Sequence, residues 1–290
     1  MSFTLYPGCT IQNRIPFLEA SARFVFEKLG VSLGSADFNC CPNPVGLKLY
    51  DKMAWLTLAG RNLAVAESEK RDVMSLCNGC FQSMFQADYE LKHDSLLKEL
   101  VNKALTQIGK EYKGNVTVKH FVQVLYKDIG VDKIKAAITK PLTGLKVAVH
   151  PGCHYARPSH IVQTDDPKKP IHLKELVKAT GATLVENPAE TLCCGQLVRY
   201  QDEKVANGIL KTKMDGVINS GADILVVNCP ACFQELDNQQ KNLKEEGKEY
   251  KVPIVYITEL LALAMGKNTE DIGMKFHRNR GKEVFDKLGL

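Results

Sequence analysis

The sequence has no apolar run approaching the 18 or so consecutive residues that a membrane-spanning helix needs. Its first residues, MSFTLYPGC, also lack the basic stretch and the apolar core of a secretory signal peptide. We therefore expect no membrane insertion and a cytoplasmic location. The 290 residues are 44% hydrophobic and 24% charged, which is ordinary for a globular protein whose halves can each bury a core.

A strong excess of one charge is also missing. The formal net charge is +5, and no basic arm or Arg-rich helix with interleaved aromatics is present. Such a balance attracts anionic partners only weakly. We therefore expect no nucleic-acid binding.

Two common redox motifs are absent. No C-x2-C-x2-C-x3-C-P run occurs, so a ferredoxin-type cluster is not expected. No G-x-G-x-x-G follows a predicted strand, so nothing indicates flavin or nicotinamide binding in the manner of a Rossmann fold.

Cysteine, in contrast, is abundant and regularly spaced. In a cytoplasmic chain, clustered thiols more often bind metals or carry out redox chemistry than form disulfides. The spacing in the first half is C-x30-CC-x35-C-x2-C, and in the second half C-x39-CC-x34-C-x2-C. The first set comprises Cys9, Cys40, Cys41, Cys77 and Cys80, and the second comprises Cys153, Cys193, Cys194, Cys229 and Cys232.

The residues around these cysteines repeat as well. YPGC at Tyr6–Cys9 corresponds to HPGC at His150–Cys153, and CNGCFQ from Cys77 corresponds to CPACFQ from Cys229. A repeat of this kind indicates internal duplication. We expect two domains, spanning residues 1–141 and 142–290.

Short apolar segments that end at the cysteines predict strands. SFTLY (2–6) and LKVAVH (145–150) run into a Pro-Gly turn, while RDVMSL (71–76) and ADILVVN (222–228) run into C-x2-C. Helix-like segments alternate with them. The fold class is therefore α/β, with two similar α/β domains whose parallel-type sheets are related by duplication.

This fold also predicts where the cysteines lie. Ligands of parallel α/β sheets gather outside the carboxyl ends of the strands, where the cysteines of each set would meet. The adjacent cysteines would enter from a loop that precedes a long helix. We expect that helix over residues 45–70 in the first half and 199–219 in the second.

Several kinds of site could use five thiols. Buried structural cysteines do not explain a repeated five-position pattern, and disulfides would leave one thiol of each set over. A zinc site takes four thiolates, one fewer than each half offers, and a zinc-binding scaffold remains an alternative. Five thiolates also suit an iron–sulfur cubane with a nearby reactive thiol, or a larger irregular cluster. Adjacent thiolates would reach two neighbouring iron atoms in such a cluster.

The double pattern resembles the cysteine-rich CCG domain, and two copies in a chain of this length resemble the B subunit of the heterodisulfide reductases of methanogenic archaea. The resemblance implies two noncubane [4Fe-4S] clusters, each ligated by one cysteine set. It also implies reduction of the mixed disulfide of coenzyme M and coenzyme B, an anionic substrate, to two thiols. The CCG subunits of lactate, glycolate or quinone-linked oxidoreductases are the nearest alternative.

The resemblance also implies partners. Because the chain has no ferredoxin-type motif, it needs another protein to supply electrons. The family uses its C subunit, which carries ferredoxin-type clusters, and its flavin-bearing A subunit, and we expect a hydrogenase or formate dehydrogenase in the larger assembly. Our hypothesis is that the disulfide lies between the two clusters, and that each cluster takes one sulfur and supplies one electron.

Release of two thiols requires protons, and histidine titrates near neutral pH. His154, directly after Cys153, is the candidate catalytic acid, with Tyr155 as a weaker choice. His150 ends a predicted strand and is expected in the core. Cationic contacts to the anionic substrate are expected among Lys48, Arg157, Lys168, Lys169 and Arg199.

Overall fold

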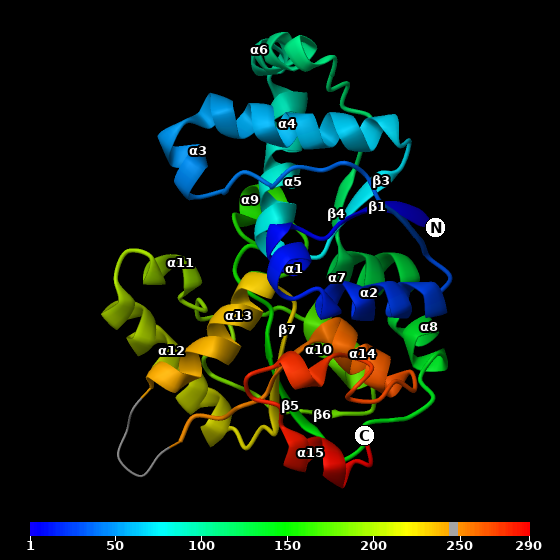
Figure 1. Cartoon of the computed structure of the whole chain (residues 1–290), viewed down its shortest axis with the longest axis vertical. Helices are drawn as coiled ribbons and strands as arrows, with labels where there is room; N and C mark the ends of the chain where they lie inside the picture. Colours follow the sequence, from blue (N-terminus) through cyan, green and yellow to red (C-terminus); the bar gives the residue numbers. More distant parts are fainter. Residues whose placement is uncertain (244–248) are drawn as a thin grey trace.

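A computed structural model of the chain describes residues 1–243 and 249–290. Within these residues it contains two four-stranded sheets, and each sheet takes its strands from one half of the sequence (Figure 1). The first sheet has the order β2-β1-β3-β4, with β1 (Ser2–Tyr6), β2 (Ser32–Gly34), β3 (Asp72–Ser75) and β4 (Val118–His120). The second has the order β6-β5-β7-β8, with β5 (Lys146–His150), β6 (Thr183–Leu184), β7 (Ile224–Val227) and β8 (Ile254–Tyr256).

All neighbouring strands in both sheets are parallel, which confirms the predicted fold class. The central strand β7, Ile224–Val227, is buried at every position. A continuous apolar run of this kind is typical of a parallel strand that is covered on both faces.

Helices alternate with these strands in both halves, and further helices follow the last strand of each half. Those of the first half are α1 (Cys9–Arg14), α2 (Phe17–Lys28), α3 (Gly46–Tyr50), α4 (Lys52–Ser68), α5 (Asn78–His93), α6 (Ser95–Leu105), η1 (Thr106–Ile108), α7 (Phe121–Gln123), the π-helix η2 (Val124–Ile129) and α8 (Val131–Ala136). Those of the second are α9 (Ser159–Val162), α10 (His172–Ala179), α11 (Gln196–Arg199), α12 (Glu203–Asn219), α13 (Pro230–Asn238), η3 (Gln239–Asn242), α14 (Ile257–Ala264), η4 (Met274–Phe276) and α15 (Lys282–Lys287).

The long helices predicted over residues 45–70 and 199–219 are interrupted, so this prediction was wrong in detail. Asp51 separates α3 from α4, and its carboxylate accepts a hydrogen bond of 2.9 Å from the backbone N–H of Ala54. Asp202 caps α12 in the same way, through the N–H of Val205 at 2.9 Å. An aspartate at this position starts a new helix, because it satisfies a backbone donor that has no partner within the helix.

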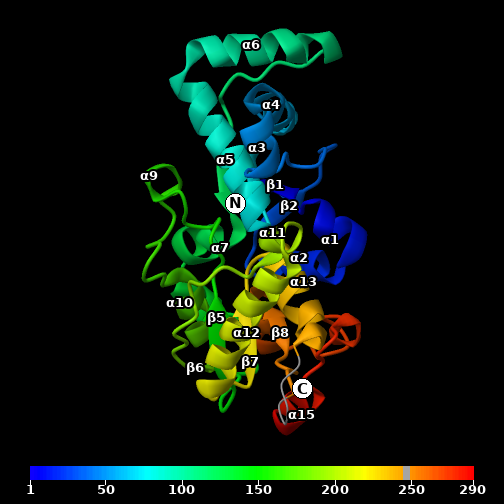
Figure 2. The same ribbon diagram turned by 90° about the vertical axis from the view of Figure 1, so that its left-hand side faces the viewer.

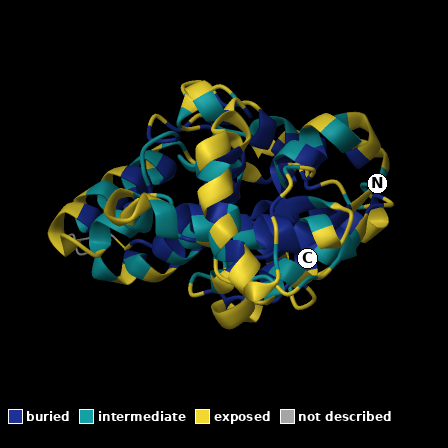
Figure 3. Cartoon of the chain, turned by 90° about the horizontal axis from the view of Figure 1, so that it is seen from above, coloured by how far each residue is buried: buried dark blue, intermediate teal, exposed yellow. Residues whose placement is uncertain are grey.

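Helices of the two halves pack against each other. Helix α2 of the first half contacts α14 of the second, while α10 of the second contacts α7, η2 and α8 of the first. Between α2 and α14, the buried hydroxyls of Ser21 and Thr258 lie 2.7 Å apart. The buried apolar side chains form one core that includes both halves. Figure 3 colours the chain by burial, with the buried residues in dark blue. The division into residues 1–141 and 142–290 stays a prediction, since the two sheets share this helical layer.

The molecule is elongated along the direction that relates the two sheets. Figure 2 shows α5 and α6 extending to one end, with α15 at the other. No helix among the described residues combines the length and the apolar character that crossing a membrane would require.

Candidate metal centre

The carboxyl ends of the central strands lie level with each other in both sheets. Tyr6, which ends β1, pairs in register with Ser75 of β3, and His150 of β5 pairs with Val227 of β7. The chain turns directly after these residues into the segments that carry the cysteines. The sequence therefore brings residues about 70 positions apart to one sheet edge, as open parallel sheets do.

All ten predicted cysteines line one cavity of about 290 Å³, together with His154. None of the ten forms a disulfide. Five are buried, and Cys9 and Cys40 are exposed. The structure thus gathers both cysteine sets around a common space.

Sulfur atoms within the first set lie close together. The Sγ atoms of Cys41 and Cys80 are 2.9 Å apart, and those of Cys40 and Cys9 are 3.7 Å apart. The adjacent cysteines therefore point to different members of the set, with Cys40 toward Cys9 and Cys41 toward Cys80. An adjacent pair arranged in this way can serve two neighbouring metal ions.

In the second set, a ring nitrogen of His150 and the sulfurs of Cys194 and Cys232 all lie within 4.8 Å of one another, and all three side chains are buried. The backbone N–H of Gly195 donates to Cys193 Sγ at 3.3 Å. The second site thus contains an imidazole among its thiols.

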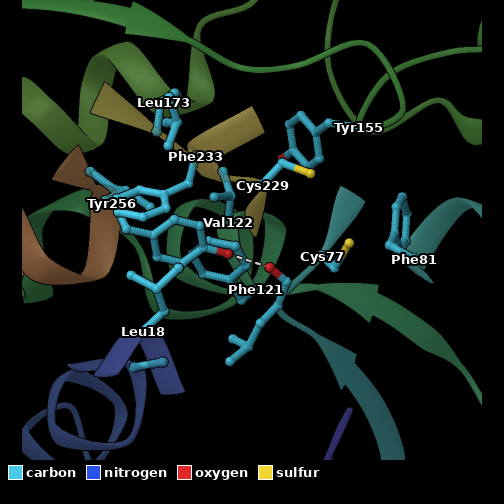
Figure 4. Close-up of a cluster of buried hydrophobic side chains, with 14 of the residues drawn as sticks. Leu18, Cys77, Phe81, Phe121, Val122, Tyr155, Leu173, Cys229, Phe233 and Tyr256 are labelled. Atoms are coloured by element: carbon cyan, nitrogen blue, oxygen red, sulfur yellow. Dashed lines mark hydrogen bonds between the residues drawn. The ribbon is translucent and has the colours of Figure 1, made fainter. Parts of the chain in front are cut away.

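The two sets approach each other at their C-x2-C motifs. A hydrogen bond between Cys77 and Cys229, followed by burial, raises the pKa of Cys77. Figure 4 shows both residues beside the Phe121 and Tyr256 rings, whose centroids are 5.4 Å apart. The Tyr256 hydroxyl donates to the Leu76 carbonyl of the other half, which holds the two strand ends together.

The C-x2-C cysteines of both sets lie at helix N-termini. Cys77 is the N-cap of α5, and Cys80 lies in its first turn. Cys229 is the N-cap of α13, with Pro230 at the first helical position. The partial positive charge at a helix N-terminus stabilises a thiolate.

Glycines after the first strand of each half let the backbone approach the sulfurs. Gly8 has φ +80°, and a Cβ placed on it would lie 2.9 Å from Cys80 Sγ. Gly152 has φ +71°, and its Cβ would lie 2.4 Å from Asn78 Nδ2 and 3.6 Å from Cys232 Sγ. Only glycine takes this conformation without strain and leaves this space open.

The thiols strongly influence one another's protonation. Hydrogen bonds from Cys153 and then Cys194 lower the pKa of Cys193 to about 2. The hydrogen bond with Cys193 and then burial raise the pKa of Cys153. Similarly, hydrogen bonds from Cys40 and then Cys80 hold the pKa of Cys41 well below its usual value. Metals bind the deprotonated thiolate, so a set of thiols this close together releases its remaining protons when a metal binds.

His154 reaches the cavity, as its place in the sequence predicts. Its Nδ1 is buried and has no hydrogen-bond partner within the described part of the chain. Burial lowers the pKa of His154, while the negative charges of Cys229 and Cys193 oppose that shift. Thr10 follows Cys9 as His154 follows Cys153, and it also lines the cavity.

Tyr155 and His150 have other surroundings. Tyr155 is buried, and its hydroxyl lies 2.7 Å from Nδ1 of His172. It does not line the cavity, so the structure does not support a proton-donating role. His150 is buried in the core as expected, and it is also close to the sulfurs.

None of the five predicted cationic contacts lines the cavity, so the structure does not bring these side chains to the cysteines. Lys48 pairs with Glu90 at 2.7 Å, and Nε of Arg199 lies 2.8 Å from Oε1 of Glu235. These carboxylates come from other helices and take the charges that a substrate would need. Arg157 donates to a backbone carbonyl, and Lys168 and Lys169 follow Asp166 in an outer loop.

Sequence reasoning missed Lys213, which is fully buried. Its Nζ donates to the Ala189 carbonyl at 2.6 Å and lies 3.1 Å from His150 Nδ1. Burial lowers the pKa of Lys213 to about 8, and the charges of Cys232 and Cys194 oppose the shift. A signal was present, because Lys213 lies in the apolar stripe of α12 formed by Ala206, Leu210, Met214 and Val217.

Comparison with known proteins supports the resemblance seen in the cysteine pattern. The cysteine-rich domain family, CCG, matches residues 3–85 and 147–237. The chain is 36% identical, over 98% of its own length and 96% of the relative's, to the B subunit of the ferredoxin/F(420)H(2)-dependent CoB-CoM heterodisulfide reductase of Methanosarcina acetivorans. It is 34% identical to a protein of Archaeoglobus profundus that is named as similar to the heterodisulfide reductase B subunit, with 94% of the chain and 93% of the relative covered.

A further relative has a different name. The 8-methylmenaquinol:fumarate reductase membrane anchor subunit of Wolinella succinogenes is 29% identical, with 94% of this chain and 95% of the relative covered. Among solved structures, a hypothetical protein from Helicobacter pylori matches with a TM-score of 0.74 at 15% identity. That match covers 96% of this chain and 52% of the other, and it shows the fold alone. The two CCG matches and the near full-length identity to the Methanosarcina protein together show that this chain belongs to the family of heterodisulfide reductase B subunits, which are CCG-domain proteins.

Proposed function

We propose that this chain is the catalytic subunit of a heterodisulfide reductase, which reduces the mixed disulfide of coenzyme M and coenzyme B to two thiols. The observation that supports this most directly is the cavity lined by both complete cysteine sets. The names of the Methanosarcina and Archaeoglobus relatives agree with it.

We propose that each cysteine set holds one noncubane [4Fe-4S] cluster. Thiolates are soft ligands that select zinc, copper(I) or iron–sulfur clusters. Five thiols per set exceed the four that a tetrahedral zinc site uses. The glycine turns at Gly8 and Gly152 leave room beside the sulfurs, and the helix N-termini at Cys77 and Cys229 favour negative charge there. When bound, such clusters would supply electrons one at a time.

The chain's own residues would position the substrate and supply a proton. The cavity wall includes Pro44, Leu197 and the exposed Tyr200, which would pack against hydrocarbon parts of a bound disulfide. His154 is our candidate for the group that gives a proton to a product sulfur, since its Nδ1 has no partner in the described residues. Because both cysteine sets line the same cavity, a disulfide bound there would reach both.

We also propose that the chain works within a complex. Its relatives are named as subunits, and the chain has no ferredoxin-type motif. A partner resembling the C subunit of the family would supply electrons to this chain. The flavin-bearing A subunit would pass electrons to that partner, and a hydrogenase or formate dehydrogenase would complete the assembly. Cys9 and Cys40 are exposed, so the first set offers the shorter path from a docked partner.

Anaerobic metal and sulfide analysis of the purified chain tests this proposal. We expect about eight irons per chain, matching acid-labile sulfide, no zinc, and oxidation of a reduced one-electron dye that depends on the heterodisulfide. Zinc held tightly by four thiolates in each half, or a colourless zinc-loaded protein without iron, would contradict it.

The Wolinella relative supports a second candidate function, an iron–sulfur subunit of a quinone-linked oxidoreductase. The two functions differ in what oxidises the reduced protein. Mixing the anaerobically reduced chain with the heterodisulfide, and separately with a menaquinone analogue, distinguishes them. Oxidation by the quinone alone would favour the second function.

A further inference from the structure

Asn62 and Lys213 occupy the same position in the two halves. Helices α4 and α12 both have 17 residues, and each is capped by an aspartate whose carboxylate accepts from the N–H three residues later. Counted from these caps, Asn62 corresponds to Lys213. Both side chains are fully buried.

Both residues anchor the loop that leads to the adjacent cysteines. Asn62 Oδ1 accepts from the Asn39 N–H at 2.9 Å, and its Nδ2 donates to the Cys40 carbonyl at 3.4 Å. Lys213 donates to the Ala189 carbonyl at 2.6 Å, shortly before Cys193. A neutral amide performs this structural task in the first half, so a charge is not needed for it.

The residues that end β1 and β5 differ in the same way, with a neutral group in the first half and a basic group in the second. The Tyr6 hydroxyl donates to the Asn39 carbonyl at 2.6 Å. His150 takes the equivalent place, with Nδ1 3.1 Å from the Glu190 carbonyl and 3.1 Å from Lys213 Nζ. Through His150, the buried ammonium is connected to the sulfurs of Cys194 and Cys232.

The ammonium of Lys213 has no carboxylate partner among the described residues, where its hydrogen-bond partners are backbone carbonyls and His150. The nearby Glu190 carboxylate is paired with Lys174 at 2.8 Å. A buried charge is costly unless an opposite charge compensates it. The negative charge that would compensate it lies on the side of the second cysteine set.

We propose that Lys213 is a positioning residue that stabilises the more negative, reduced state of the group held by the second cysteine set, so that the first electron comes to rest on this set whichever set it enters by. This inference rests on the proposed function. The step adds one electron from a ferredoxin-type donor and moves no proton, and the negative charge of the second set rises by one. A positive charge close by raises the reduction potential, because it is attracted more strongly to the reduced state.

Solvent at the first set would raise the reduction potential of that set, which opposes the difference that Lys213 produces between the two sets. Cys9 and Cys40 are exposed, and water also stabilises negative charge. A full charge enclosed in protein, however, is screened much less than one that interacts through water. We therefore expect Lys213 to outweigh the difference in exposure.

A redox titration of the iron-loaded chain, monitored by electron paramagnetic resonance, tests the inference. We expect two resolved midpoint potentials in the unaltered protein. Lys213→Gln, which keeps a hydrogen-bond donor but removes the charge, should lower the higher potential by at least about 59 mV, a tenfold change in the one-electron equilibrium constant. Lys213→Arg should restore it, and Lys213→Met provides a second neutral variant should the glutamine variant not fold.

Two control variants separate charge from structure. Lys211→Met removes a charge from the same helix at a side chain that is 43% exposed, and Asn62→Ala removes the equivalent loop anchor of the first half. Neither should move the higher potential. A higher potential that stays unchanged in Lys213→Gln, or that moves equally in Lys211→Met, would overturn this inference while the iron content still supports the proposed function. A chain without iron would overturn the proposed function itself, and this inference with it.

Discussion

The two halves of the molecule share their strand order, their capped helices and their cysteine spacing, yet they surround the cysteines with different chemistry. At four of the corresponding positions the first half has a neutral side chain where the second has a basic or acidic one. These pairs are Tyr6 and His150, Thr10 and His154, Asn62 and Lys213, and Gln123 and Glu259. The repeated elements therefore set the positions of the sulfurs, while the residues that do not repeat set the local charge.

Exposure differs as well. Cys9 and Cys40 are exposed, whereas their counterparts Cys153 and Cys193 are partly buried. The longer segment after Cys153 contains α9, which contacts α5 of the first half. The two sets therefore differ in their access to solvent and to partners.

Removing one cysteine ligand, from either half in turn, should have the largest effect. In Cys41→Ala and in Cys194→Ala we expect loss of roughly half the iron, because each set would hold its own cluster. We expect neither variant to reduce the heterodisulfide, since one disulfide would need both sets. Iron analysis and turnover assays provide the measurement, and full activity in either variant would show that the sets act independently.

The residues after Cys9 and Cys153 allow a second comparison. His154→Gln should lower turnover roughly 10²-fold or more, because a positioned proton donor contributes about that much, while the iron content stays unchanged. Thr10→Val, at the corresponding position, should have little effect. Steady-state kinetics with iron analysis checks both, and equal losses in the two variants would remove His154 as the acid.

The glycine turns can be compared through stability. Gly8→Ala and Gly152→Ala should each lower the free energy of unfolding by roughly 1–3 kcal/mol, from left-handed strain plus the contact of the new Cβ. Gly30 has φ +75° but nothing within 4 Å of a new Cβ, so Gly30→Ala measures the strain alone. Urea unfolding gives the values. A loss no larger in Gly8→Ala than in Gly30→Ala would mean that the Cys80 sulfur moves freely aside.

The smallest expected effect concerns pH. Burial lowers the pKa of His277, but Glu259, whose Oε1 lies 2.9 Å from its Nε2, raises it above the ordinary value. The protonated pair therefore stabilises the fold below the usual histidine pKa of about 6.5, and this contribution is lost as pH rises through the raised pKa. The first half has Gln123 in place of Glu259 and lacks this pair.

His277→Gln should therefore lower the free energy of unfolding more at about pH 6 than at about pH 9, by about 1.4 kcal/mol for each pKa unit of the shift. Urea unfolding across this range measures the difference. His93→Gln, at an exposed histidine, is the control and should show no such trend. A constant difference between His277→Gln and the unaltered protein would contradict the assigned ion pair.

Much of the fold followed from local pattern. The strand segments, the alternation with helices and the convergence of the cysteines were predictable because parallel sheets place strand ends at one edge. Even the breaks before α4 and α12 had a local signal in Asp51 and Asp202, which the helical periodicity concealed. His154 was predictable because it adjoins Cys153.

The cationic residues show what local pattern does not contain. Whether Lys48 or Arg199 is free for a substrate depends on Glu90 and Glu235, which come from other helices. The burial of Lys213 likewise depends on how α12 packs against the loop before Cys193.

The sequence alone determined the α/β class, the duplication and the ten thiols, because strand and helix periodicity and ligand spacing are properties of neighbouring residues. The tertiary structure decided which charges are paired, which histidine meets the sulfurs, and how the two halves differ electrostatically. Electrostatic energy depends on distance and burial in space, and the order of residues along the chain does not contain these quantities.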